Sequence, residues 1–530
     1  MNAFLQQIHF AGWALHFLIW FPVVGMFGVL LAPEAVSKRL ALIVTLVEFI
    51  VSVALWPAFN AATAAFQFAT SMPWIQPWGI YYRVGIDGIS LFLVLLTTFI
   101  MPLTVLGSFR YITKRERTFY AMMLLLETGI VGVFVALDLF LFFMFWEVML
   151  VPMYFIIGIW GGERRIYAAI KFFLYTTFGS LLMLVAILYM VFKFHALTGE
   201  YSFAYLDLAQ VPLTYREQIW LFLAFGLAFA IKVPLFPFHT WLPDAHVEAP
   251  TPGSVVLAAV LLKMGGYGFL RFLLPFFPQA STAPVLVGIV LAFGLAGIVY
   301  TAWVAAVQPD AKKLIAYTSV AHMGFVVLGI FALTVQGLQG AMIVMLSHGA
   351  STGAMFLLLG MLYERRHTRE IAAFGGLAAV MPLFATVFVI TALASIGLPG
   401  TSGFVGEFLS LLGTFLTHPW VAVIGATGVI FAAYYMLPMV QRIWFNALDK
   451  PENQKLSDLS RREIVVLAPL VAAMIWIGVY PKPFLDATQA SIVELLATVE
   501  QRRVAPAPIM GLGAPAPAAT PGRLVVARQP

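Results

Sequence analysis

A succession of long apolar runs limits the fold of this chain more than any other feature of its sequence. A helix needs about 20 apolar residues to cross a bilayer, and about fourteen such runs lie between charged or Pro/Gly-rich breaks. The candidate spans lie near residues 11–32, 37–58, 86–107, 119–136, 138–160, 168–192, 218–238, 253–275, 283–305, 311–333, 338–361, 381–408, 420–446 and 463–482. Backbone polar groups at that depth must be hydrogen-bonded within the chain, so each span is expected to be a helix. The sequence therefore predicts an all-α, polytopic membrane protein.

Composition excludes several other classes of protein. Only 10% of the residues are charged, against roughly 25% in ordinary soluble domains. The chain has no cysteine, which excludes disulfides, zinc–thiolate sites and iron–sulfur clusters. The net charge of +6 is scattered over short loops, a pattern that indicates membrane orientation and no nucleic-acid partner. The N-terminus lacks a basic segment and an Ala-x-Ala cleavage site, so it is expected to be a retained first helix.

Lysine and arginine give the expected orientation. Connections after odd-numbered spans hold 18 of these residues, and even-numbered connections with the C-terminal tail hold nine. Because positive loops stay in the cytoplasm, the odd side is predicted to be cytoplasmic and, with an even number of spans, both termini periplasmic. We expect a folded surface loop near 193–216 and a short interfacial helix near 483–500. The Pro/Ala-rich tail after Arg503 is expected to be disordered.

Ionisable residues inside the spans are the main functional signal. A charge at the bilayer centre costs about 2.5–3.5 kcal/mol, and such groups usually face water or a protein interior. Glu147, Lys232 and Lys263 lie within apolar runs. We assign the arginines to the connections and take Lys171, Lys232 and Lys263 as the basic groups inside the membrane. A buried lysine can lose its proton, whereas arginine stays charged. The use of lysine in place of arginine favours proton transfer over static ion pairing. For Glu147, the alternative is a structural acid held by hydrogen bonds.

A proline-rich break follows Lys232. Pro234 and Pro237 lack N–H groups. The carbonyls of Ala230 and Val233 are therefore expected to lack their helical donors, which would make a place for a proton or a cation. The alternative is a lysine that merely fills a kink.

The span near 381–408 contains a second break, at Pro399, followed by Glu407. Glycines surround the break: Gly397, Gly400, Gly403 and Gly406. They could simply permit close helix packing, and no strand precedes them, so they do not form a nucleotide loop. One broken helix in each half indicates an inverted repeat with sites near the midplane of the membrane.

Histidines supply further candidates for proton transfer. His322 and His348 lie in consecutive spans and could relay protons, since histidine titrates near neutral pH; hydrogen-bonded core histidines are the alternative. His239 and His246 flank Asp244, a composition that resembles metal ligands. We interpret this segment as a proton entrance.

Four other ionisable residues carry weaker signals. Glu127 and Lys171 could belong to the relay or could pair structurally. Glu48, in the second span, is expected to be structural. Asp138 is expected to cap the start of the fifth span, because a carboxylate suits a helix N-terminus.

Five long segments resemble the antiporter-like membrane subunits of respiratory complex I, and the likeness runs from about residue 80 to 445. They are RVGIDGISLFLVLLTTFI, ALDLFLFFMFWEVMLVPMYFIIGIWGG, FAIKVPLFPFHTWLPDAHVEAPTPGSVVLAAVLLKMGGYG, SVAHMGFVVLG and GLPGTSGFVGEF. The resemblance implies fourteen helices with two inverted five-helix repeats, each with a broken helix. It places the family's key glutamate at Glu147, its broken-helix lysine at Lys232 and its central lysine at Lys263. The distal site falls on Glu407, where sister subunits carry lysine.

The resemblance also implies a domain division. Residues 1–115 would hold helices one to three, 116–280 the first repeat, 281–446 the second repeat, 447–502 the last transmembrane helix with the interfacial helix, and 503–530 the tail.

As a function, the resemblance implies proton translocation in the bacterial inner membrane, driven by quinone reduction elsewhere in an NADH–quinone oxidoreductase. FMN, iron–sulfur clusters and quinone are expected on other subunits, with no cofactor or metal on this chain. The expected partners are other membrane subunits, including sister antiporter-like subunits, and lipid. Protons would enter near His246, load Lys232 and Lys263, pass along His348 and His322, and leave by Glu407. The alternatives are a subunit of a multisubunit sodium/proton antiporter or of a membrane-bound hydrogenase.

Overall fold

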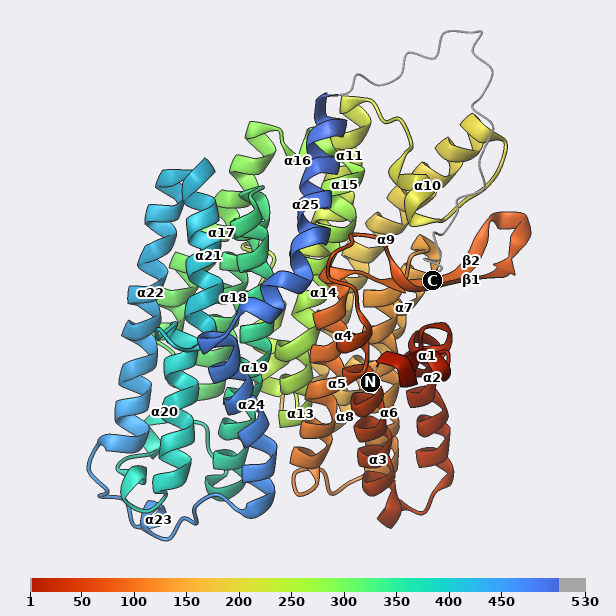
Figure 1. The fold of residues 1–530 in the computed structure, drawn as a ribbon. Helices are drawn as coiled ribbons and strands as arrows, with labels where there is room; N and C mark the ends of the chain where they lie inside the picture. The colour runs from red at the N-terminus through yellow and green to blue at the C-terminus, as the bar shows by residue number, and fades with distance from the viewer. Residues whose placement is uncertain (1, 505–530) are drawn as a thin grey trace.

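The computed structural model describes residues 2–504, which form an elongated bundle of helices (Figure 1). The N-terminal helices lie at one end of the bundle and α20 and α22 at the other, with α14, α18 and α19 between them. In this part of the chain, 12 helical segments are long and apolar enough to cross a membrane. They are α2 (Phe10–Leu31), α3 (Glu34–Val53) with α4 (Leu55–Ala58), α5 (Gly88–Ser108), α6 (Glu116–Val135), α7 (Leu139–Val148) with α8 (Leu150–Trp160), α9 (Arg165–Thr198), α13 to α15 (Thr251–Phe276), α17 (Pro284–Ala306), α18 (Ala311–Phe331), α19 (Val335–Arg366), α22 (Pro419–Val440) with a π-helical turn (Gln441–Phe445), and α24 (Arg461–Val479).

Two further predicted spans, near 218–238 and 381–408, belong to interrupted helices that extend beyond the predicted bounds, to Glu248 and Thr417. The first consists of α11 (Tyr215–Lys232) and α12 (Trp241–Glu248), and the second of α20 (Pro382–Ile396) and α21 (Ser402–Thr417). Each predicted span therefore has helix at its place, and the expectation of two broken helices agrees with these interruptions. The number of segments that cross a membrane stays a prediction, as does the inverted repeat.

The first interruption keeps more of its backbone hydrogen bonds than the prolines suggest. The N–H of Leu235 donates to the carbonyl of Ala230 at 2.7 Å, so the prediction of a free carbonyl at Ala230 is wrong. The chain closes a wider turn there, because the next available N–H after Pro234 is that of Leu235. The indole of Trp241 donates to the carbonyl of Ile231 at 2.9 Å. The carbonyls of Ala230 and Ile231, at the end of α11, are thus both hydrogen-bonded.

The second interruption depends on glycine. Gly397 ends α20 with φ of +86°, and Gly400 follows with φ of +90°. Residues with a side chain rarely adopt this left-handed region. These two glycines turn the chain so that α21 starts beside the end of α20.

One element of the fold was not predicted. Residues 67–86 form an antiparallel hairpin of β1 (Gln67–Ile75) and β2 (Ile80–Ile86), within a chain that is otherwise helical, as predicted. The hairpin is joined to the bundle by the carboxylate of Asp138, which accepts from the N–H of Tyr81 and lies 3.4 Å from Arg83. The same carboxylate accepts from the first-turn N–H groups of α7, in the capping role expected for it. The predicted surface loop near 193–216 contains the end of α9 and a short helix, α10 (Tyr205–Ala209).

The C-terminal helix α25 (Lys482–Val504) crosses the bundle obliquely (Figure 1). It packs on α5, α16 (Pro278–Ser281) and α19, and its Ser491 hydroxyl accepts from the N–H of Gly88 at 2.9 Å. The helix is longer than the predicted segment 483–500 and ends at Val504. The tail predicted to be disordered lies, from residue 505 on, outside the described residues.

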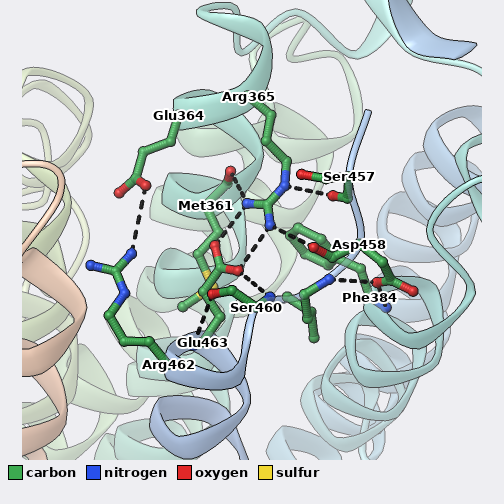
Figure 2. A network of polar contacts seen from close by, with 10 residues as sticks. Met361, Glu364, Arg365, Phe384, Ser457, Asp458, Ser460, Arg462 and Glu463 are labelled. Atoms are coloured by element: carbon green, nitrogen blue, oxygen red, sulfur yellow. Dashed lines mark hydrogen bonds and ion pairs between the residues drawn. The ribbon is translucent and has the colours of Figure 1, made fainter. Parts of the chain in front are cut away.

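A network of polar contacts joins α19, α20 and α24 (Figure 2). The guanidinium of Arg365 donates to both carboxylate oxygens of Glu463, at 2.8 and 2.9 Å. It also donates to the carbonyls of Ser457 and Asp458. The Asp458 carboxylate in turn accepts from the N–H of Phe384 at the start of α20. Bidentate arginine–carboxylate pairs of this kind fix geometry strongly, so the first half of the broken helix is held in place.

Candidate functional site

Four predicted site residues form a continuous chain of side chains. The amino group of Lys263 on α14 (Leu262–Gly268) lies 2.6 Å from Nδ1 of His348 on α19. The rings of His348 and His322 have centroids 5.6 Å apart. Nδ1 of His322 on α18 lies 2.9 Å from Oε1 of Glu407 on α21. All four side chains are buried. We call these four residues the axis.

The helix that carries Lys263 is locally widened. Residues Leu257–Leu261 form a π-helical turn, and the amino group of Lys263 donates to the carbonyl of Ala258 at 2.5 Å. π-helical turns are rare in proteins as a whole. Those that occur often lie at functional sites, because they change the regular backbone hydrogen-bond ladder. A backbone carbonyl thus becomes the second partner of the buried lysine.

The two axis histidines differ in their hydrogen bonds. His322 uses both ring nitrogens, because Nε2 lies 3.2 Å from the hydroxyl of Ser395 on α20. His348 uses Nδ1 alone, and its Nε2 has no hydrogen-bond partner. A cavity of about 10 Å³ borders both histidines, Glu407 and Ser395, which is close to the volume needed for one water. A proton could therefore pass between the rings through a single water.

The charges of Lys232 and Glu147 interact, but among the described residues no ion pair within 4.0 Å joins the two side chains. The buried amino group of Lys232 lies 3.4 Å from the sulfur of Met149 and over the rings of Trp146 and Phe172, at 5.4 and 5.7 Å. The Glu147 carboxylate is half-buried and interacts electrostatically with Lys232. The lysine is therefore held by soft and aromatic contacts, which leave its amino group available for proton exchange.

Close backbone packing connects Lys232 to the axis. A methyl group on Gly265 would come within 2.8 Å of the Phe229 carbonyl and the Val233 N–H. Only glycine permits this approach, so the break after Lys232 lies directly against the helix that carries Lys263.

The expected proton entrance contains His239, His246, Lys171 and Asp244. Lys171 and Asp244 form an ion pair at 2.7 Å, and both are partly exposed. His239 stacks on Phe236, with ring centroids 5.6 Å apart. His246 is fully buried, and neither of its ring nitrogens has a hydrogen-bond partner. Within residues 2–504 no three His, Asp or Glu side chains are grouped so that they could hold a metal ion.

Glu127 faces a residue that was expected to be merely structural. Its carboxyl group on α6 interacts with that of Glu48 on α3, and both side chains are fully buried. No hydrogen bond or ion pair joins Glu127 to the axis among the described contacts. The structure therefore does not bring Glu127 into the relay.

Sequence reasoning missed two residues: Ser395, which contacts His322 of the axis, and Lys312, at the start of α18. Ser395 carries no charge, and nothing in its pattern separates it from a packing serine. Lys312, counted in the sequence analysis among the basic residues on the cytoplasmic side, lies in the first turn of α18 and is 7% exposed. The preceding Asp310, which caps α18 through the N–H groups of Lys312 and Lys313, was the available signal that the helix begins there.

Comparison with known proteins gives consistent relatives. The family model described as "NADH:quinone oxidoreductase/Mrp antiporter, TM" matches residues 136–432, and that described as "NADH-ubiquinone oxidoreductase chain 4, amino terminus" matches residues 27–132. NADH-quinone oxidoreductase subunit M of Rhodobacter capsulatus is 50% identical over 476 residues, which are 88% of this chain and 91% of the relative.

Solved structures show the same fold. A chain of respiratory complex I from Thermus thermophilus with bound NADH matches with a TM-score of 0.83 and 34% identity, covering 91% of this chain and 99% of that chain. A chain of the Mrp complex from Dietzia sp. DQ12-45-1b matches with a TM-score of 0.77 at 20% identity, covering 93% of this chain and 55% of that chain. The second likeness concerns the fold alone.

Proposed function

This chain belongs to the subunit M family of the NADH–quinone oxidoreductases, and we propose on that premise that Lys263, His348, His322 and Glu407 carry protons through it. The chain is a proton-translocating membrane subunit of such a complex, and its partners are the other membrane subunits, including sister antiporter-like subunits. We assign FMN, the iron–sulfur clusters and quinone to other subunits. The bacterial inner membrane, with both termini periplasmic, is the proposed location.

The contact that carries this proposal is the unbroken row of titratable side chains in the axis. Protonated Lys263 donates to Nδ1 of His348, whose ring then carries the charge. His348 passes a proton to His322, directly or through one water, and His322 gives a proton to Glu407 through Nδ1. Histidine suits both middle positions because it accepts on one nitrogen and donates from the other.

Glu147 and Lys232 are proposed to drive the transfer. A nearby negative charge stabilises a charged lysine by about 1.4–4 kcal/mol. Moving one charge against 100 mV requires about 2.3 kcal/mol. A change in the attraction between Glu147 and Lys232 is therefore large enough to load or release one proton.

The domain division supports a two-step path. We assign residues 116–280 and 281–446 to two inverted repeats. Each contains a broken helix, α11–α12 or α20–α21, and each ends in a helix with a π-helical turn. The first repeat carries Lys232 and Lys263, and the second carries the outward end of the axis at Glu407.

The sodium/proton antiporter and hydrogenase alternatives are not favoured. The likeness to the Mrp complex rests on fold at 20% identity, whereas subunit M of Rhodobacter capsulatus is 50% identical.

The proposal is tested with Glu407→Ala in inverted membrane vesicles that hold equal amounts of assembled complex. NADH-driven proton uptake and quinone reduction should both fall, because a stalled proton step slows a coupled enzyme. Glu200→Ala is the matched control, since Glu200 is exposed on the loop after α9. Normal proton uptake by Glu407→Ala would remove Glu407 from the path.

A further inference from the structure

A second polar cavity lies on the side of the bundle that the sequence predicts to be cytoplasmic. Its volume is about 70 Å³, room for several waters by the volume that one water needs. Residues at its wall include Tyr111, Glu248, Thr251, Lys312, Tyr363 and Arg369. The connections that follow α5, α8 and α19 all contribute residues to its wall.

Lys312 lies at the inner wall of this cavity. Its amino group donates to the carbonyl of Ala249 at 2.6 Å and approaches that of Val247 at 3.5 Å. An ammonium group has three donors, so one donor remains for the cavity. The carbonyl of Val247 also accepts from Arg369 at 2.5 Å. Lys312 therefore connects the cavity to the end of α12.

His246, on the same end of α12, lies deeper in the bundle. Its ring stacks on Phe356, with centroids 4.5 Å apart and planes 12° apart. The charges of both Lys312 and Lys263 act on this ring. A fully buried imidazole without a hydrogen-bond partner on either nitrogen is rare. The two carbonyls that Lys312 contacts belong to Val247 and Ala249, one and three residues after His246, so this unpartnered ring lies next to the segment that holds the lysine.

We propose that Lys312 is the proton-loading residue of an intake in which protons pass from this cavity through His246 to Lys263. The inference rests on the proposed function, because it supplies the axis with protons. It differs from the route through Lys232, since it reaches Lys263 from α18 and α12.

The transfer conserves protons at each step. Neutral Lys312 takes a proton from water in the cavity, and its new N–H bond makes it an ammonium. That bond breaks when the proton moves, directly or through a water, to one ring nitrogen of His246. The resulting imidazolium releases the proton of its other nitrogen to the neutral amine of Lys263. The ring returns to its neutral form as the other tautomer, and no group is oxidised or reduced.

The groups around Lys312 determine how this step depends on pH. Glu248 and His246 face it from α12, and Asp310 and Arg369 lie beside it. Burial raises the pKa of Tyr111, so this hydroxyl stays neutral and can only exchange hydrogen bonds with water. Glu248 is the acidic group of the cavity wall that can attract protons from the cytoplasm.

The test compares Lys312→Arg with Lys313→Arg in the intact complex. Arginine keeps the positive charge and can donate to the carbonyls of Ala249 and Val247, but it does not release a proton. The number of protons taken up per NADH should fall in Lys312→Arg to the value of Lys263→Ala. Lys313→Arg should equal the parent, because Lys313 does not border the cavity. A normal ratio in Lys312→Arg would overturn the proposal and leave Lys312 as a structural tie.

Chemical rescue separates proton loading from packing. The chain has no cysteine, so Lys312→Cys adds a single thiol to it, which 2-bromoethylamine converts to a lysine-like amine. The amine should restore proton uptake, whereas methylation of the same thiol should not. The same reagent on Lys312→Met controls for thiols of other subunits. Failure of the amine to rescue would overturn the proposal, and normal uptake by Lys263→Ala would instead remove the proposed function.

Discussion

Glu147 stands apart from the other charges of the site at the scale of single residues. The axis side chains are buried and in contact, but Glu147 is half-buried, and its Oε1 has no hydrogen-bond partner. Its charge interacts with that of Lys232, and the proposed switch depends on this charge. That dependence can be measured.

We expect Glu147→Gln to lower proton pumping about tenfold, the effect of losing about 1.4 kcal/mol of electrostatic stabilisation, while the complex still assembles. Glu147→Asp should keep part of the activity because its charge survives. Proton uptake per NADH, at equal amounts of complex, is the measurement. Pumping by the Gln variant at the rate of the parent would contradict the switch role of Glu147.

The identities of the site residues could be predicted at this scale, but their partners could not. Lys263, His348, His322 and Glu407 stand out because charge inside an apolar run is expensive. Their contacts depend on how α14, α18, α19 and α21 pack. Ser395 and Lys312 gave no such signal, because Ser395 is uncharged and Lys312 lies at the very start of its span, where a lysine normally marks the cytoplasmic side.

At the scale of elements, the two glycines between α20 and α21 allow a controlled comparison. Both have positive φ. A methyl group on Gly397 would lie 3.1 Å from Oε2 of Glu407, whereas one on Gly400 would meet nothing within 4 Å. A side chain at either glycine would strain the backbone, but only one at Gly397 would also crowd Glu407. Comparing the two variants therefore separates the two effects.

Gly397→Ala and Gly400→Ala should each destabilise the junction by about 1–2 kcal/mol, the cost of a side chain in the left-handed region. Only Gly397→Ala should also reduce proton uptake per NADH by displacing Glu407. Thermal unfolding of the purified complex gives the first effect and vesicle assays give the second. Equal pumping by the two variants would show that Glu407 tolerates the shift.

Elements differed in how well their sequence predicted them. The interruptions at Pro234 and Pro399 were predictable, since proline lacks a donor and the glycines supply positive φ. Two other features were not predicted. The missing N–H of Pro234 is visible in the sequence, but not that the N–H of Leu235 reaches the Ala230 carbonyl instead. The π-helical turn before Lys263 has no signal in its residues. The hairpin at 67–86 was missed because its apolar and aromatic residues lie between two spans and resemble a connection.

At the scale of the whole molecule, the distribution of basic residues makes a prediction about sidedness. Cysteines introduced at Ala35 and Glu200, both exposed, should react with a membrane-impermeant reagent from opposite sides, because they lie in connections of opposite parity. Ala35 should react in inverted vesicles and Glu200 in intact spheroplasts. Reaction of both from one side would show that the orientation or the number of spans is wrong.

The oblique helix α25 has a mechanical consequence. At 1.5 Å per residue its 23 residues make a rod of about 34 Å. Hydrogen bonds join it to Gly88 of α5, to the carbonyl of Pro275 through Arg502, and to Gln339 of α19, and Pro275 and Gln339 lie in the two repeats that we propose. A rod fastened at three such points resists rocking of one half against the other, the motion by which many carriers expose a substrate alternately to each side. We therefore expect charge to move through this protein by small rearrangements of side chains and water, while the helices keep their positions.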